Sequence, residues 1–462
     1  MSEPSPDDKG QDLLTGRIVP TFFYYTIPWV MGLVMMSSAV IVDGIFLGNY
    51  VGAGALAAVN MILPATSLLF AVTLMMSVGG SVMCGKYIGE NRREAADAIF
   101  TKTFLAVVTL ALLFGLVGVT FLEEIVALLG VNDVLAKDAG DYFRIFCLFQ
   151  VFFMGAICLS YFLRLDGRPL FVSTVIIANA FLNIALDYVF IAHLEMGVSG
   201  AASATAISHG LSFLIFANHL WRGQGRLRLT RHVGALRELL SAAYNGVSEG
   251  TNEMSAGLLT LLFNWVMIKR LGVDGVAAFS IVNYLLFIGL MISYGISDSL
   301  QPLVSTNFGA RQPRRVAAFV LVASLSVAGM GLILATLLLL APEPMVSVFL
   351  KEGEARALAI ALQFSSFFWP AFLFAGVNVV ISSYLTSMQR PLASAAVALS
   401  RSLVFPALLL LTLPLALGDA GIYLSIPLAE LGCLALSLIL LLRNTPTRLM
   451  AKAGSAPAQD RI

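Results

Sequence analysis

The chain has 462 residues, of which 58% are hydrophobic and 12% charged, with a mean hydropathy of +0.88 and a formal net charge of +1. Soluble domains carry about twice this share of charged residues, so the composition excludes an ordinary water-soluble protein. The near-zero net charge gives no indication of a nucleic-acid partner.

Apolar stretches of membrane-spanning length follow one another along the chain. A bilayer core of ~30 Å needs roughly 20 apolar residues per helix, and backbone groups in lipid must be satisfied within the segment. Because these stretches do not alternate with period two, they predict an all-α integral membrane protein rather than a β-barrel. We predict twelve transmembrane helices, near residues 20–48, 54–83, 97–120, 140–164, 170–192, 197–221, 237–268, 274–307, 315–341, 360–388, 391–415 and 420–443.

The basic residues predict the orientation of these helices. With both termini in the cytoplasm, most of the 28 Lys and Arg residues fall on the cytoplasmic side, as the positive-inside rule requires. An odd number of helices would destroy this asymmetry. We therefore expect a multi-pass protein of the plasma membrane, or inner membrane of a bacterium, with both termini cytoplasmic.

Three matches in the same order divide the chain into two parallel repeats. Residues 51–62 resemble 271–282 and residues 88–98 resemble 308–318, whereas DGRPL at 166–170 resembles MQRPL further along. The common offset between these matches contains an even number of helices, so the repeats have the same orientation. The predicted parts are a cytoplasmic tail (1–19), an N-lobe of helices one to six (20–221), a basic cytoplasmic loop (222–236), a C-lobe of helices seven to twelve (237–443) and a cytoplasmic tail (444–462).

Two aspartates inside apolar helices of the first repeat mark a candidate ion site. An aspartate at a helix centre costs roughly 2.5 to 3.5 kcal/mol, so such residues usually face a partner or a cavity. Asp43, Asp187 and Thr205 lie at a similar depth, ~8–12 Å from the outer helix ends. Asn183 precedes Asp187 by one helical turn and shares its face. These oxygens could carry a proton or bind Na⁺; the alternatives are an interfacial Asp43 and an Asp187 that hydrogen-bonds a neighbouring helix.

The second repeat has no aspartates at the equivalent positions. Instead Asn245, Glu249 and Glu253 follow at i, i+4 and i+8, which predicts one helix face with a substrate-cation or second proton site. The alternative is that Glu249 is a solvated surface charge and only Glu253 is buried. Arg401 and Glu430 lie near the middle of their helices, where we expect an ion pair that joins helices eleven and twelve; the alternative is a role in transport.

Five segments taken together resemble the multidrug and toxic compound extrusion (MATE) family, in particular its MepA-like bacterial branch. They are residues 27–64, 79–100, 182–191, 197–208 and 301–316. The resemblance implies V-shaped six-helix lobes, alternating access, and antiport of H⁺ or Na⁺ against organic, often cationic, substrates. It also implies a coupling-ion role for Asp43, Asn183, Asp187 and Thr205.

We therefore predict a secondary active multidrug efflux transporter that exports lipophilic or cationic compounds. The motif GSVMCGKY at 80–87 has Tyr87 where a phosphate loop needs Ser or Thr, so no nucleotide is expected, and no cofactor beyond the coupling ion. We expect a monomer in the lipid bilayer, without nucleic acid and without enzymatic activity. Two alternatives stay open: a flippase of the same superfamily for lipid-linked oligosaccharides or precursors, which would need more intramembrane basic residues, and a membrane-embedded enzyme.

Overall fold

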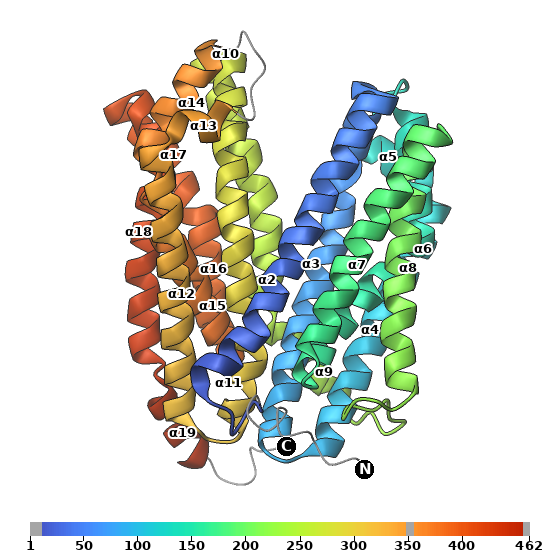
Figure 1. Cartoon of the computed structure of the whole chain (residues 1–462), viewed down its shortest axis with the longest axis vertical. Helices are drawn as coiled ribbons and strands as arrows, with labels where there is room; N and C mark the ends of the chain where they lie inside the picture. Colours follow the sequence, from blue (N-terminus) through green and yellow to red (C-terminus); the bar gives the residue numbers. More distant parts are fainter. Residues whose placement is uncertain (1–11, 348–354, 456–462) are drawn as a thin grey trace. The chain divides into compact units, whose positions relative to one another are not determined.

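The structure is a computed structural model that describes residues 12–347 and 355–455. The outer ends of both predicted tails, 1–11 and 456–462, lie outside the described residues. All elements assigned in the described part are helical, which agrees with the predicted all-α class (Figure 1). The chain forms two compact units, residues 24–246 and residues 247–462, and the second also includes the chain up to Phe23.

The unit of residues 24–246 is a bundle in which α6 packs against α3, α4 and α8, while α7 packs along α8 (Figure 1). Its largest apolar core includes Phe100, Phe162 and Phe216, all almost inaccessible to solvent. The helices are α2 (Ile18–Phe46), η1 (Leu47–Val51), α3 (Ala53–Gly89), α4 (Arg93–Thr120), α5 (Leu122–Leu128), α6 (Ala136–Leu165), α7 (Pro169–Asp187), η2 (Tyr188–His193), α8 (Gly197–Trp221) and α9 (Leu236–Asn245).

In the unit of residues 247–462, α15 packs against α10, α12 and α18, and α17 lies along α18. The N-terminal segment joins this unit through Arg315 and Asn307, whose side chains donate hydrogen bonds to the carbonyl groups of Leu13 and Gly16. The helices are α10 (Val247–Asp298), α11 (Leu300–Gly309), α12 (Pro313–Leu340), α13 (Pro342–Ser347), α14 (Ala355–Phe368), α15 (Ala371–Ser387), α16 (Pro391–Leu399), η3 (Ser400–Val404), α17 (Phe405–Leu417), α18 (Asp419–Arg443) and α19 (Pro446–Ser455).

Ten helices of the described part are long and apolar enough to cross a membrane, or eleven if the bent pair α14 and α15 forms one span. Twelve were predicted. The predicted seventh helix corresponds to the first part of α10, which carries Glu249, Asn252 and Glu253 and is absent from this set. Gly272 separates it from the predicted eighth helix, because its φ of 68° is a conformation that glycine adopts without strain.

The turns repeat between the two units at the positions that the sequence matches pair with each other. Asn91 and Arg311 both have positive φ and end helices α3 and α11 with the same hydrogen-bond pattern. Gly167 and Gln389 do the same after α6 and α15. The backbone therefore preserves a repeat that the side chains show only weakly. The V-shaped arrangement of the lobes stays a prediction.

The basic loop between α8 and α9 is bound to the unit of residues 24–246 along its length. Asp166 accepts hydrogen bonds of 2.8 and 3.0 Å from the N–H groups of Arg226 and Leu227. Further along, Asp97 accepts one from Arg228, Thr101 accepts one from Thr230, and Lys102 forms an ion pair with Glu238 on α9. The predicted connector, residues 222–236 and called the strap below, is thus held against this unit by hydrogen bonds.

Candidate ion and substrate sites

Asp43 and Asp187 lie together in the unit of residues 24–246, on α2 and at the end of α7. Their side chains interact directly with each other. Asp187 has no solvent exposure, and apart from Asp43 neither of its carboxylate oxygens has a hydrogen-bond partner among the described residues. Two adjacent carboxylates without donors repel each other in an apolar environment, so a proton or a cation must accompany them.

A π-helical turn follows each of these aspartates. Asp43 precedes η1 by one turn and Asp187 directly precedes η2. In both turns an N–H bonds the carbonyl five residues back, Gly52 to Leu47 and Leu194 to Val189, each at 2.9 Å. Such widened turns often occur at functional sites, and hydropathy gave no indication of them.

Tyr142 on α6 is a neighbour of the pair that our sequence analysis missed. It interacts electrostatically with both Asp43 and Asp187 and packs against the surrounding apolar residues. Its position one and a half turns into a spanning helix was a signal for a polar partner, because a buried phenol usually finds one. Asp43, Asp187 and Tyr142 are thus neighbouring polar side chains that come from three different helices, α2, α7 and α6.

The other two predicted ion ligands differ in their placement. Asn183 is buried one turn before Asp187 on α7, and its Nδ2 has no hydrogen-bond partner among the described residues. Thr205 on α8 is half-buried, and its backbone carbonyl accepts a hydrogen bond from the hydroxyl of Ser208. Asn183 therefore has an unused donor one turn from the carboxylate of Asp187, whereas a cation would bind its amide oxygen. The coupling roles of Asn183 and Thr205 both stay predictions.

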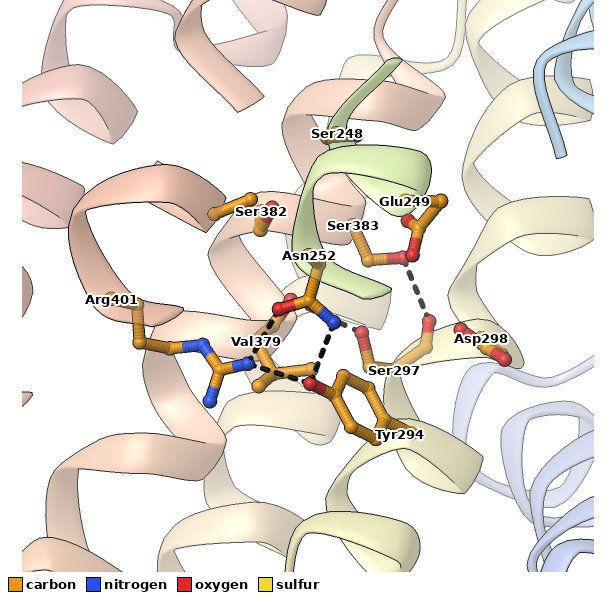
Figure 2. Close-up of a pocket in the computed structure, with 11 residues that line it drawn as sticks. Ser248, Glu249, Asn252, Tyr294, Ser297, Asp298, Val379, Ser382, Ser383 and Arg401 are labelled. Atoms are coloured by element: carbon orange, nitrogen blue, oxygen red, sulfur yellow. Dashed lines mark hydrogen bonds between the residues drawn. The ribbon is translucent and has the colours of Figure 1, made fainter. Parts of the chain in front are cut away.

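The unit of residues 247–462 contains a polar cavity of about 320 Å³, including its open mouth. Figure 2 shows Arg401 on one side of it, Glu249 and Asp298 on the other, and Asn252 and Tyr294 between them. Serine hydroxyls complete the wall, from Ser248, Ser297, Ser382 and Ser383.

Of the three residues predicted to share one face, only Glu249 and Glu253 lie on the same helix. The prediction for Asn245 was wrong, because Asn245 ends α9 and the helix breaks at Gly246 before α10 begins. The break has a packing cause: a Cβ at Gly246 would lie 1.9 Å from the carbonyl oxygen of Met75 on α3. The chain can pass this close only as glycine. Glu249 lines the cavity and interacts with Asp298, Arg401 and Glu253.

The predicted ion pair between Arg401 and Glu430 is confirmed, with Nη1 at 3.6 Å from Oε1 and both side chains buried. Nη2 of Arg401 also donates to Asn252 Oδ1 at 2.8 Å and to Tyr294 Oη at 2.6 Å (Figure 2). Asn378 donates to Glu430 Oε2 at 2.8 Å. Arg401 lies within the third π-helical segment, η3, so it joins η3 to α10 and α18, and Asn378 links α15 to Glu430.

The sequence model of the MatE family matches residues 28–189 and 254–411, one segment in each repeat. The protein belongs to the MatE family. The matched segments include Asp43, Asn183, Asp187 and Arg401, and they leave out the strap and the start of α10. Family membership also identifies the chain as a multi-pass membrane protein.

Curated relatives and solved structures are similar over most of the chain. The multidrug export protein MepA of Staphylococcus haemolyticus is 22% identical over 93% of this chain and 95% of its own length. The probable multidrug resistance protein YoeA of Bacillus subtilis is 23% identical, over 79% and 80%. A crystal structure of MATE in complex with MaL6 superposes with a TM-score of 0.90, at 20% identity and over 96% of this chain and 99% of that one. The last similarity shows the fold.

Proposed function

We propose that this protein exports lipophilic organic cations in exchange for H⁺ or Na⁺, by alternating access. The observation that carries the proposal is the pair Asp43 and Asp187, two adjacent carboxyl groups whose charge no described basic side chain balances. Such a pair binds a proton or a cation when it is closed off from water and releases it when water enters. The names of MepA and YoeA, both multidrug proteins, support an organic cargo.

An ion can drive export only if its binding favours one conformation over the other. The pair is well placed for this role, because Asp43 and Asp187 come from different helices, each close to a π-helical turn. With the ion absent, repulsion between the carboxylates favours separation of α2 and α7. With the ion bound, the repulsion disappears and the helices can close.

The cavity beside α10 is the proposed contact site for the positive end of the cargo. Arg401 and Glu430 balance each other's charge, which leaves Glu249 and Asp298 as the acidic groups of the cavity that can attract a cation. A cation is therefore favoured over an anion. This charge balance argues against the flippase alternative, since an anionic phosphate needs several basic residues around it.

The proposal is tested with purified protein in liposomes and ethidium, a fluorescent lipophilic cation, under a proton gradient or a sodium gradient imposed separately. We expect one gradient to drive ethidium accumulation, and Asp43→Asn and Asp187→Asn to reduce the rate by a factor of roughly 100. The exposed residue Asp133 provides the control, since Asp133→Asn makes the same chemical change in the same unit. Full activity of both site variants, or no accumulation by the parent under either gradient, would refute the proposal.

The proposed setting is the plasma membrane, with both termini in the cytoplasm, one chain per transporter and no chemical change in the cargo. Recovery of unmodified ethidium after transport distinguishes export from the enzyme alternative. Protease access to a tag at either terminus in right-side-out vesicles checks the orientation, since cleavage from outside would contradict it.

A further inference from the structure

His209 is a half-buried titratable group in the middle of a membrane-spanning helix, and the proposed export mechanism does not use it. It lies twelve residues from either end of α8, Gly197–Trp221, which corresponds to about 18 Å of helix. Its ring packs on Phe153 of α6, with the centroids 4.2 Å apart. Asn179 of α7 places Nδ2 3.1 Å from its Nδ1. The imidazole therefore faces the interior of its unit, and an ionisable residue at this depth usually marks an ion path.

Asn179 connects His209 to the aspartate pair through the register of α7. Asn179, Asn183 and Asp187 follow one another at intervals of four, so all three project from one face of the helix. On α8, Ser208 and Ser212 are buried next to His209, and Ser212 Oγ accepts a hydrogen bond of 3.0 Å from Asn179 Nδ2.

These side chains form a polar stripe between α7 and α8, and the packing around it is apolar. The stripe consists of Asp187, Asn183 and Asn179 on α7 and of Ser208, His209 and Ser212 on α8. Large aromatic side chains, including Phe104, Phe152 and Phe213, pack against each other nearby. An apolar contact between α7 and α8 would need none of the six polar groups, and burying a polar group costs free energy unless a hydrogen bond compensates it.

We propose that His209 is a second proton-binding group, which receives the proton from the pair Asp43 and Asp187 on its way along the stripe. The inference rests on the proposed function and selects H⁺ as the coupling ion. Imidazole nitrogen suits a proton, whereas Na⁺ prefers oxygen ligands.

The transfer needs no chemistry beyond the movement of one proton. The Asn179 amide donates to Nδ1, which fixes the neutral ring with its proton on Nε2. Asp187 lies eight residues from Asn179, about 12 Å along α7, so water must carry the proton between them. A carboxyl group gives up the proton and becomes a carboxylate, and Nδ1 takes it on its lone pair. The Asn179 amide must rotate in the same step, because its N–H occupies this lone pair beforehand, and its oxygen then accepts from the new N–H.

The neighbouring titratable groups leave His209 free for this role. On α7 the titratable residue of the stripe is Asp187, and on α6 Tyr142 interacts with the aspartates. Arg164 of α6 stacks on Trp29 and Tyr161, and Cys84 of α3 contacts the Ala96 carbonyl. Among the described residues no charged side chain acts directly on the imidazole.

The test compares His209→Gln with the parent, with His232→Gln in the exposed strap as the matched control. Glutamine can accept the Asn179 hydrogen bond but cannot carry a proton. In liposomes, we expect proton-driven ethidium export to slow at least about tenfold and its pH profile to change, because one of the groups that bind the transported proton is gone. Ethidium binding in detergent should change less than about twofold, because the cargo site is elsewhere.

Export by His209→Gln at the parental rate and with the parental pH profile would overturn the proposal. If Asp187→Asn is inactive in the same experiment, the proposed function stands and only the role of His209 fails. Should His209→Gln not fold, Asn179→Leu replaces it. That variant keeps the imidazole and removes its donor, so the pH profile of export should shift, and an unshifted profile would equally overturn the proposal.

Discussion

Removal of Arg401 should destabilise the protein mainly because it leaves Glu430 buried without a cation. The guanidinium has one ion pair at 3.6 Å and hydrogen bonds to Asn252 and Tyr294. Breaking a buried pair by removing one partner costs about 3–5 kcal/mol, so Arg401→Met should lower the unfolding temperature by ~4 °C. In the double variant with Glu430→Gln the unpaired charge is gone, and the oxygen of the introduced glutamine can still accept from Asn378.

We therefore expect the double variant to recover about 2 kcal/mol relative to Arg401→Met. Unfolding can be followed in detergent with a dye that fluoresces on reaction with thiols, because Cys84, Cys147, Cys158 and Cys433 are all buried and react only when the chain opens. If the pair is structural, the double variant also continues to export ethidium. An equal loss of stability in the single and double variants would refute the reasoning, because removing the charge of Glu430 would then restore no stability.

Two further predictions concern packing and pH. Gly246→Ala should cost about 3 kcal/mol or more, because its Cβ would lie 1.9 Å from the Met75 carbonyl oxygen, whereas Gly140→Ala, with open space at its Cβ, should be neutral in the same thermal assay; equal stability of both would contradict the tight crossing. Burial raises the pKa of Asp166 to about 6 despite the hydrogen bonds it accepts from the strap. The folded state thus holds this proton more tightly than the unfolded state, so stability should fall by up to about 3 kcal/mol as the pH rises from about 4 to 6. Asp166→Asn should abolish this dependence of stability on pH, and an unchanged dependence would show that other groups cause it.

The sequence predicted the helices and the depth of their charged residues well. Apolar length located nearly every span, because lipid imposes the same requirement on each. Helical rise placed Asp43 and Asp187 at one level, and the structure brings their side chains into contact. The pairing of Arg401 with Glu430 followed from the cost of isolated charges at that depth.

Residues whose role depends on a neighbour from a distant part of the chain were harder to predict. Tyr142 was missed because its partners lie on two other helices, and Asn252 with Tyr294 because their hydrogen bonds to Arg401 cross from α10 to η3. The helix expected to run through Asn245 breaks there because α9 crosses α3 at glycine contacts that periodicity does not reveal.

The sequence by itself determined the solvent, the repeat and the depth of each charge, since these follow from hydropathy and from the constant rise per residue of a helix. Only the tertiary structure decided which buried polar groups meet. Hydrogen bonds and ion pairs act over a few ångströms, and the rotation of each helix about its own axis, which brings Asp187 toward Asp43 and Asn179 toward His209, is fixed by packing against its neighbours.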